Sequence, residues 1–229
     1  MKTAIITGGS GSIGEGLVAE FSKDHRVIFT YLSGGDRAKE IAEKYGAEAV
    51  CCDLNNSGEI KKLLSNINSC DLLINNAGIS SVGLFTDLSD EELDNVIGTD
   101  LTGTMKLTKA VLPFMIREKK GCIINISSIW GVYGGSCEVA YSAAKAGLIG
   151  FTKALSREVG ASGIRVNCIT PGFIESRMNS HLSQDEINDF AEGTSLGKIG
   201  KPVDVALAAR YLCSAEFVTG QVIGVDGGF

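Results

Sequence analysis

A glycine-rich stretch near the start of the chain decides its fold: Thr7-Gly8-Gly9-Ser10-Gly11-Ser12-Ile13-Gly14. A short apolar run, 3–7, precedes it and an amphipathic run, 13–23, follows, so a first strand turns into a first helix here. Glycines at such a turn let the backbone bend sharply and let main-chain amides approach a pyrophosphate at the helix N-terminus. The stretch therefore predicts a dinucleotide site; the alternative is a glycine-rich turn that binds nothing.

Outward from this loop, short apolar runs alternate with longer amphipathic ones along the whole chain. This alternation is typical of βα units around a parallel sheet. The expected strands are 3–7, 26–31, 48–52, 71–75, 122–126, 164–169 and 221–225, and the expected helices lie near 13–23, 36–45, 57–66, 90–118, 138–160 and 202–213. No linker, charge block or repeat divides the chain. We therefore predict one α/β domain, 1–229, a three-layer doubly wound Rossmann fold with a parallel sheet of about seven strands.

Composition narrows the class of protein. The 229 residues carry 21 Lys+Arg against 27 Asp+Glu, a net charge of −6, which argues against a nucleic-acid partner. No run reaches the ~18 apolar residues needed to span a membrane, and the start of the chain lacks the pattern of a signal peptide. The seven cysteines are scattered and include no Cys-x-x-Cys pair, so we expect reduced thiols, no metal site and a cytoplasmic protein.

The end of the second strand bears on the choice of cofactor. Dinucleotide sites usually carry an acid about 20 residues beyond the glycine loop to hold the adenosine ribose hydroxyls. This chain has Tyr31 and hydroxyl residues there, with Arg37 nearby, which favours NADP over NAD, although Asp36 offers a carboxylate close by. After the third strand, Asp53 and Leu54 are expected at the adenine; a turn or helix cap is an equal interpretation of Asp53.

The residues suited to acid–base chemistry come later in the chain. Ser127 and Ser128 follow the strand 122–126, and Tyr141 and Lys145 stand at i and i+4 on a helix, so both project from one face. A lysine ammonium beside a phenol stabilises the phenolate, which suits the tyrosine to proton transfer at a carbonyl or alcohol oxygen. An isolated Tyr-x-x-x-Lys pair is usually structural, and its combination with the glycine loop is what indicates catalysis.

With these motifs in this order, the chain resembles the short-chain dehydrogenase/reductase family, most of all its 3-oxoacyl-acyl-carrier-protein reductase branch. The resemblance covers essentially the whole length. Its motifs are the loop 7–14, Asp53, Asn75-Asn76-Ala77-Gly78, Ser128, Tyr141, Lys145, Pro171-Gly172-Phe173-Ile174-Glu175-Ser176, Gly200-Lys201-Pro202, Gly220-Gln221 and Asp226-Gly227-Gly228. The family's spacing places the active serine thirteen residues before the tyrosine, which selects Ser128 over Ser127.

The resemblance implies a role for each matched residue. Tyr141 is the general acid, Ser128 hydrogen-bonds the substrate oxygen, and Lys145 contacts the nicotinamide ribose and favours the phenolate. The implied cofactor-binding residues are Gly8, Ser10, Ser12, Ile13, Gly14, Tyr31, Asp53, Leu54, Asn76, Ala77, Gly78, Tyr141, Lys145, Pro171, Gly172 and Ile174. The segment 172–193 resembles a mobile lid that closes over the substrate.

Two departures from the family pattern bear on the site. Ser12 replaces the middle glycine of the loop, so its side chain points away from the pyrophosphate or hydrogen-bonds to it. Asp100, also a candidate catalytic residue, replaces an asparagine whose main-chain carbonyl helps to hold a relay water near the lysine. If the carbonyl is the working group the relay persists, whereas a carboxylate that reaches Lys145 would keep the ammonium charged and blunt its effect on Tyr141.

Partners follow from the same resemblance. Family members commonly assemble as homodimers or homotetramers through two long helices, here near 90–118 and 138–160. Members that dock acyl carrier protein carry an arginine at the position of Ser162. Because this chain lacks that arginine, Lys119 and Lys120 would supply the positive charge.

The leading hypothesis is an NADPH-dependent reductase of a 3-oxoacyl thioester or a similar small ketone. An alternative rests on Ser136-Cys137-Glu138-Val139, a run similar to the branch that reduces the 5-aminopentanone group on elongation factor P, where Glu138 would receive the substrate amine. Glu138 can also be interpreted as a first-turn acid that favours the helix dipole. A third hypothesis is a non-catalytic NADP-binding sensor, which the joint presence of Ser128, Tyr141 and Lys145 disfavours.

Overall fold

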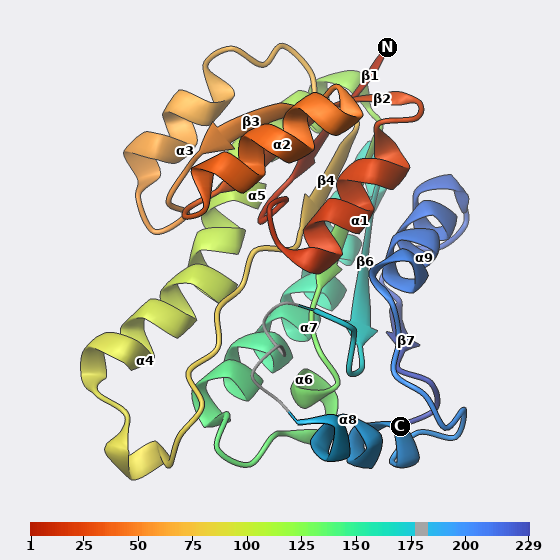
Figure 1. Cartoon of the computed structure of the whole chain (residues 1–229). Helices are drawn as coiled ribbons and strands as arrows, with labels where there is room; N and C mark the ends of the chain where they lie inside the picture. The colour runs from red at the N-terminus through yellow and green to blue at the C-terminus, as the bar shows by residue number, and fades with distance from the viewer. Residues whose placement is uncertain (177–182) are drawn as a thin grey trace.

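A parallel sheet forms the centre of the molecule (Figure 1). The computed structural model describes residues 1–176 and 183–229, and its seven strands stand in the order β3-β2-β1-β4-β5-β6-β7. Their bounds are β1 Lys2–Ile6, β2 His25–Tyr31, β3 Glu48–Cys51, β4 Leu72–Asn75, β5 Gly121–Ile126, β6 Ile164–Pro171 and β7 Val222–Val225. Every pairing is parallel. The predicted doubly wound sheet is confirmed, with strand bounds within two residues of those expected.

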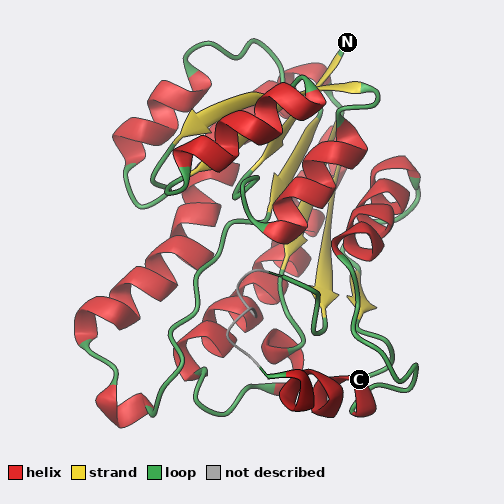
Figure 2. Ribbon diagram, in the orientation of Figure 1, coloured by secondary structure: helices red, strands yellow, loops and turns green. Residues whose placement is uncertain are grey.

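Helices cover both faces of the sheet (Figure 2). One face carries α1 Ser12–Phe21, α2 Gly35–Tyr45 and α9 Pro202–Ser214, and the other carries α3 Ser57–Leu64, α5 Thr104–Glu118 and α7 Val139–Val159. Because both faces are covered, strand residues such as Ile5 and Ile6 are fully buried although they point to opposite sides. No helix within residues 1–176 and 183–229 is both long and apolar enough to cross a membrane.

The winding of the sheet reverses next to β1. The chain passes from β1 outward to β2 and β3, then returns to place β4 against the other side of β1 and continues to β7. Ligands of open α/β sheets bind outside the carboxyl ends of the strands at such a reversal. The loops that follow β1 and β4 therefore mark the expected site.

The helix predicted near 90–118 has the expected outer bounds, but it is not α-helical throughout. The structure has α4 Asp90–Ile97, then η2 Gly98–Gly103, a π-helical segment, and only then α5. Apolar periodicity continues across such an inserted turn, so the pattern does not reveal the break. π-Helical turns occur often at functional sites, and this one carries Asp100.

The described part of the chain also contains short elements that the apolar pattern does not predict: α6 Trp130–Tyr133, α8 Gln184–Glu192, η1 Phe85–Asp87 and η3 Gly160–Ser162. The helix α8 falls within the predicted lid, 172–193. The ring of Phe190 on α8 stacks on Phe173, with centroids 4.2 Å apart, which holds the helix near the end of β6. Residues 177–182 of the predicted lid lie outside the described residues, so the lid stays a prediction.

Candidate active site

The loops after β1 and β4 are joined by hydrogen bonds through Thr7. Its buried hydroxyl accepts the N–H groups of Asn76 and Ala77, both at 2.9 Å. The Asn76 side chain donates in turn to the carbonyls of Thr7, at 3.0 Å, and Gly8, at 3.2 Å. The residues joined are 68 to 70 positions apart in sequence. The end of β4 therefore holds the glycine loop in place.

The glycine loop forms a cradle that only glycines permit. Gly8 has a φ of +65°, in the left-handed region that favours glycine. A Cβ on Gly14 would lie 2.1 Å from the carbonyl oxygen of Gly8, so a larger residue would push α1 away from the loop. The N-terminus of α1, with its amides and its positive dipole end, thus lies directly against the loop. This arrangement fits a pyrophosphate.

A hollow of about 550 Å³ lies beside this loop, between α1, α2 and the start of α9. Its lining includes Ser12, Glu15, Arg37, Tyr45 and Glu175. Arg37, expected to meet a 2′-phosphate, is ion-paired with Glu15 and lies 3.3 Å from Glu40. Two carboxylates therefore share its charge, and a phosphate that binds here competes with them.

The residues predicted at the adenine lie on neighbouring strand ends. The N–H of Cys52 donates to the carbonyl of Tyr31 at 2.9 Å, which brings Asp53 and Leu54 beside the end of β2. Asp53 Oδ1 accepts the N–H of Asn55 at 2.8 Å, as the turn interpretation of this residue requires. A contact of Asp53 with adenine stays a prediction.

Tyr141 and Lys145 lie one turn apart on α7. The Lys145 Nζ is 5.3 Å from the centre of the Tyr141 ring, and it donates to the carbonyl of Ile126, at the end of β5, at 3.2 Å. Lys145 is only 3% exposed, whereas Tyr141 is half-buried. A buried ammonium is therefore held against a phenol that solvent reaches.

Of the two alternatives for Asp100, the structure has the carboxylate on Lys145. Asp100 is fully buried; its Oδ2 lies 3.2 Å from the Lys145 Nζ, and its Oδ1 accepts the N–H of Ile79 at 2.8 Å. A Cβ on Gly78 would lie 2.7 Å from Asp100 Oδ2 and 2.9 Å from the Lys145 Nζ. The lack of a side chain on Gly78 therefore leaves the space in which this ion pair forms.

Burial and mutual attraction act against each other in this pair. Burial lowers the pKa of Lys145, but the charges of Asp100 and Tyr141 more than offset it, so this pKa lies above its ordinary value of 10.5. Burial raises the pKa of the Asp100 carboxyl, and Lys145 and the Ile79 N–H counteract it only in part. Lys145 consequently stays charged over the whole working pH range.

The two serines after β5 are held differently. The Ser127 hydroxyl donates to the main-chain carbonyl of Lys145 at 2.8 Å and so ties β5 to α7. The Ser128 hydroxyl accepts the N–H of Trp130 at 3.1 Å. A hydroxyl that accepts one bond still has its proton to donate, so this arrangement is compatible with Ser128 as the predicted active serine.

A buried chain of amides and hydroxyls supports the site, and the sequence motifs do not predict it. The Asn75 amide donates to Asn125 Oδ1 at 2.8 Å and to the Thr108 hydroxyl at 3.0 Å, and the Asn125 amide donates to the Thr152 hydroxyl at 2.8 Å. These contacts connect α5, β4, β5 and α7. The available signal is an asparagine within an otherwise apolar strand, because a buried amide needs partners.

Glu138 lies at the N-terminus of α7, as the dipole interpretation requires, although it is the N-cap residue rather than a first-turn residue. Its carboxylate makes no capping bond and instead accepts the hydroxyl of Ser80. The neighbouring Cys137 has a φ of +61°, and its carbonyl accepts the N–H of Gly83 at 2.9 Å. The loop after β4 and the loop before Tyr141 are therefore joined at two points.

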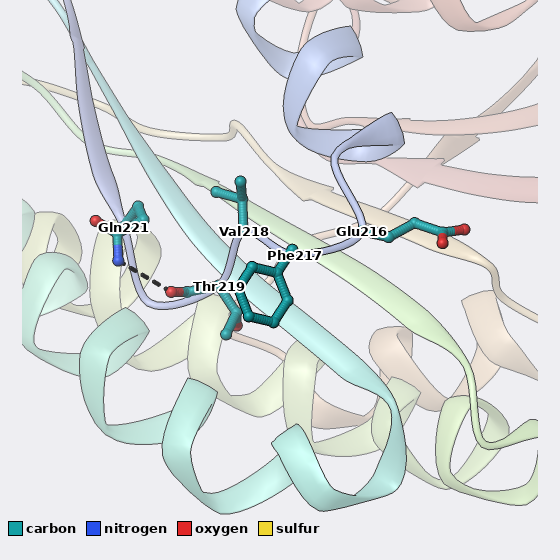
Figure 3. A pocket seen from close by; sticks show the side chains of 5 residues that line it. All are labelled: Glu216, Phe217, Val218, Thr219 and Gln221. Carbon is teal, nitrogen blue, oxygen red and sulfur yellow. Dashed lines mark hydrogen bonds between the residues drawn. The ribbon is translucent and has the colours of Figure 1, made fainter.

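A second hollow, of about 390 Å³, lies between the end of α9 and β7 (Figure 3). It is lined by Glu216, Phe217, Val218, Thr219 and Gln221. Gln221 donates to the carbonyl of Thr219 at 3.1 Å, and Phe217 is fully exposed. This hollow offers no acid–base pair. Elsewhere too, within the part of the chain that the structure describes, no three His, Cys, Asp or Glu side chains are grouped to hold a metal ion.

Similar proteins are known over the whole length of the chain. Residues 8–229 match a family model described as enoyl-(acyl carrier protein) reductase. The 3-oxoacyl-acyl-carrier-protein reductase FabG of Chlamydia muridarum is 39% identical over 239 residues, which cover 99% of this chain and 96% of the relative. FabG of Aquifex aeolicus is 36% identical with the same coverage. An uncharacterized oxidoreductase of Bacillus subtilis, YmfI, is 35% identical over 238 residues, 100% of this chain and 98% of the relative.

Proposed function

The chain belongs to the short-chain dehydrogenase/reductase family, and on this premise we propose that it reduces the ketone of a 3-oxoacyl thioester, or of a similar small ketone, with NADPH. Family membership makes it an oxidoreductase acting on CH–OH groups with a nicotinamide cofactor. The observation that carries the proposal is the buried Lys145 ammonium, held 5.3 Å from the Tyr141 ring by Asp100 and Ile126.

Each residue has one task in this proposal. NADPH, when bound, supplies the hydride. Ser128 donates a hydrogen bond to the substrate oxygen and orients it, and Tyr141 gives that oxygen its proton as negative charge develops. Lys145 stabilises the phenolate that remains, and Asp100 fixes the position of the ammonium.

Two features support NADPH over NADH. The end of β2 carries Tyr31 where an acid would repel a 2′-phosphate, and Arg37 lines the adjoining hollow. Release of Arg37 from Glu15 is part of this proposal, because a phosphate contact requires it.

We also propose acyl carrier protein as the carrier of the ketone. Lys119 and Lys120 are exposed at the end of α5, and the turn that contains Ser162 lies against them, since a Cβ on Gly163 would be 2.3 Å from the Lys119 carbonyl oxygen. Replacing both lysines by glutamate is expected to raise KM for a carrier-bound ketone and to leave KM for a free thioester unchanged. A homodimer or homotetramer through α5 and α7, in the cytoplasm, completes the proposal.

A second candidate function is reduction of the 5-aminopentanone group on elongation factor P. It is favoured by Glu138, a half-buried carboxylate three residues before Tyr141 that bonds only a neutral hydroxyl, Ser80, among the contacts of the described residues. A substrate ammonium would pair with this carboxylate. Glu138→Gln is expected to raise KM for an amino ketone and to leave KM for an acetoacetyl thioester unchanged.

The test follows oxidation of NADPH and of NADH at 340 nm with an acetoacetyl thioester. We expect turnover with NADPH, and a fall in kcat of about 10³-fold in Tyr141→Phe with NADPH affinity unchanged. Tyr211→Phe, on the exposed side of α9, is the matched control and keeps full activity. Tight NADPH binding without turnover on any ketone, the amino ketone included, would favour the sensor hypothesis.

A further inference from the structure

The hollow between α1, α2 and the start of α9 contains a network of charged side chains centred on Glu15. This residue stands in the first turn of α1, and its side chain is only 19% exposed. Its Oε2 accepts a hydrogen bond from the Arg37 guanidinium. Its Oε1 lies 3.3 Å from the Lys44 Nζ and accepts the Tyr45 hydroxyl at 3.4 Å. One carboxylate of α1 therefore holds three side chains of α2.

Arg37 is not fully satisfied in this network. It donates through Nη2 to Glu15 and through Nη1 to Glu40, the second bond being 3.3 Å long. Its Nε is buried and has no hydrogen-bond partner among residues 1–176 and 183–229. A guanidinium binds a phosphate through two parallel N–H groups, so a phosphate would supply acceptors that Arg37 lacks.

The start of α2 brings Arg37 close to the end of β2. A Cβ on Gly35, the first residue of α2, would lie 3.8 Å from the Tyr31 ring at the end of that strand. The adenosine ribose of a dinucleotide binds near the end of this strand, so its 2′ position falls within the region of Arg37. In this structure, however, the guanidinium is paired with Glu15 on the neighbouring helix.

We propose that Glu15 is a specificity-determining residue, which weakens the preference for NADPH over NADH because it holds Arg37. The inference rests on the proposed reduction with NADPH and names the residue that limits its cofactor preference. A 2′-phosphate has to displace Glu15 from Arg37, and the Glu15 carboxylate also repels it. NADH carries a hydroxyl at this position and leaves the Arg37–Glu15 pair intact, so neither effect weakens its binding.

Two contacts keep Glu15 in place when Arg37 leaves it. Lys44 and Tyr45 both bind Glu15 Oε1, and the Lys44 Nζ also lies 4.8 Å from the centre of the Tyr45 ring. The carboxylate therefore retains a cation and a hydroxyl as partners, and it does not follow Arg37 to the phosphate. The exchange requires the movement of one long side chain, that of Arg37, which is 36% exposed.

The first experiment titrates the full chain with NADPH and with NADH and follows the fluorescence of each cofactor. Glu15→Gln should lower the Kd for NADPH at least about threefold and leave the Kd for NADH unchanged. The matched control is Glu43→Gln, which removes an exposed carboxylate from α2 and changes the net charge equally; both Kd values should stay the same. An equal gain for NADH, or an equal gain in the control, would overturn the proposal.

A double-mutant cycle shows whether Glu15 acts through Arg37. Arg37→Gln alone should raise the Kd for NADPH, and adding Glu15→Gln to it should lower that Kd much less than in the unmodified chain. The same gain with and without Arg37 would contradict the proposal. These titrations require no turnover, so a chain that reduces no ketone would contradict the proposed function and leave the assignment of Glu15 standing.

A second experiment needs no variant that might fail to fold, because it uses the unmodified chain. NMR follows the Arg37 Nε–Hε resonance while adenosine 2′,5′-bisphosphate or AMP is added. We expect the bisphosphate to shift this resonance and AMP, which lacks the 2′-phosphate, to leave it in place. The same response to both nucleotides would show that Arg37 does not exchange Glu15 for a 2′-phosphate, and the proposal would be wrong.

Discussion

The two ends of the central sheet each hold a charged cluster, and the two clusters differ in how far water reaches them. At the carboxyl end, Asp100 and Lys145 are 0% and 3% exposed and 3.2 Å apart. At the amino end, His25 is buried but the side chain of its partner Asp24 is 55% exposed. Removing one member of a fully buried pair costs about 3–5 kcal/mol, whereas a solvent-screened pair contributes at most about 1 kcal/mol. Stability should therefore depend on charge at the carboxyl end far more than at the amino end.

The largest effect is expected from Lys145→Met, which leaves the Asp100 carboxylate buried without its partner. We expect reduction to be lost and the free energy of unfolding in urea to fall by about 3–5 kcal/mol at neutral pH. The deficit should shrink as the pH falls, because protonation of Asp100 removes the unpaired charge. Lys39→Met, on the exposed side of α2, should change stability by less than about 0.5 kcal/mol. Equal unfolding midpoints for the two variants would show that the buried charge at the carboxyl end of the sheet contributes no more to stability than an exposed charge.

Gly14→Ala tests the glycine loop, which also lies at the carboxyl end of the sheet. The added Cβ would lie 2.1 Å from the Gly8 carbonyl oxygen and must displace α1. We expect the Kd for NADPH, measured by fluorescence titration, to rise at least about tenfold, or about 1.4 kcal/mol. The control is Gly160→Ala in η3, where no atom lies within 4 Å of the added Cβ; it should leave the Kd for NADPH unchanged.

Asp100→Asn removes the negative charge of the buried pair and keeps the shape of the side chain. Burial is the largest influence on Lys145, and without the carboxylate it is opposed mainly by Tyr141, so the pKa of Lys145 should fall. The stabilising contribution of Lys145 is complete below pH 10.5 and is lost as pH rises through its higher folded value. In the variant, the pH at which Lys145 loses its stabilising contribution should be lower. The alkaline limb of the kcat/KM profile should move to lower pH as well. An unmoved profile with a raised KM would mean that Asp100 acts through shape alone. Asp90→Asn, in the exposed first turn of α4, is the control.

The smallest effect is expected from Asp24→Asn at the amino end. Loss of this carboxylate removes one cause of the raised pKa of His25, which should move toward 6.5 in an NMR titration. His25 stabilises the fold fully below pH 6.5, and this contribution disappears as pH rises through its folded value. Stability at pH 6 should fall by less than about 1 kcal/mol, and kcat/KM for the ketone should not change. A loss as large as that of Lys145→Met would show that both ends depend equally on charge.

The sequence predicts the sheet, the glycine loop and the Tyr141–Lys145 pair because each depends on residues close together in the chain. From the sequence, the contact of Asp100 with Lys145 is only one of two alternatives. The contact depends on the π-helical turn η2 and on the space that Gly78 leaves, and no local motif reveals either. The Ser80–Glu138 bond and the Asn75–Asn125 chain join segments 58 and 50 positions apart, and no local pattern encodes such pairings. Buried polar contacts between distant segments are where prediction from this sequence stops.

The hydrogen bonds that join Thr7 to Asn76 and Ala77 have a consequence for folding during synthesis on the ribosome. The glycine loop is synthesised before its anchor, which appears 69 and 70 positions later. Until β4 has left the exit tunnel and paired with β1, the nascent loop lacks the bonds that shape it. Recognition of the dinucleotide is therefore a late event in biogenesis, and a ribosome-bound fragment that ends before Asn76 should not be retained on a nucleotide-affinity resin.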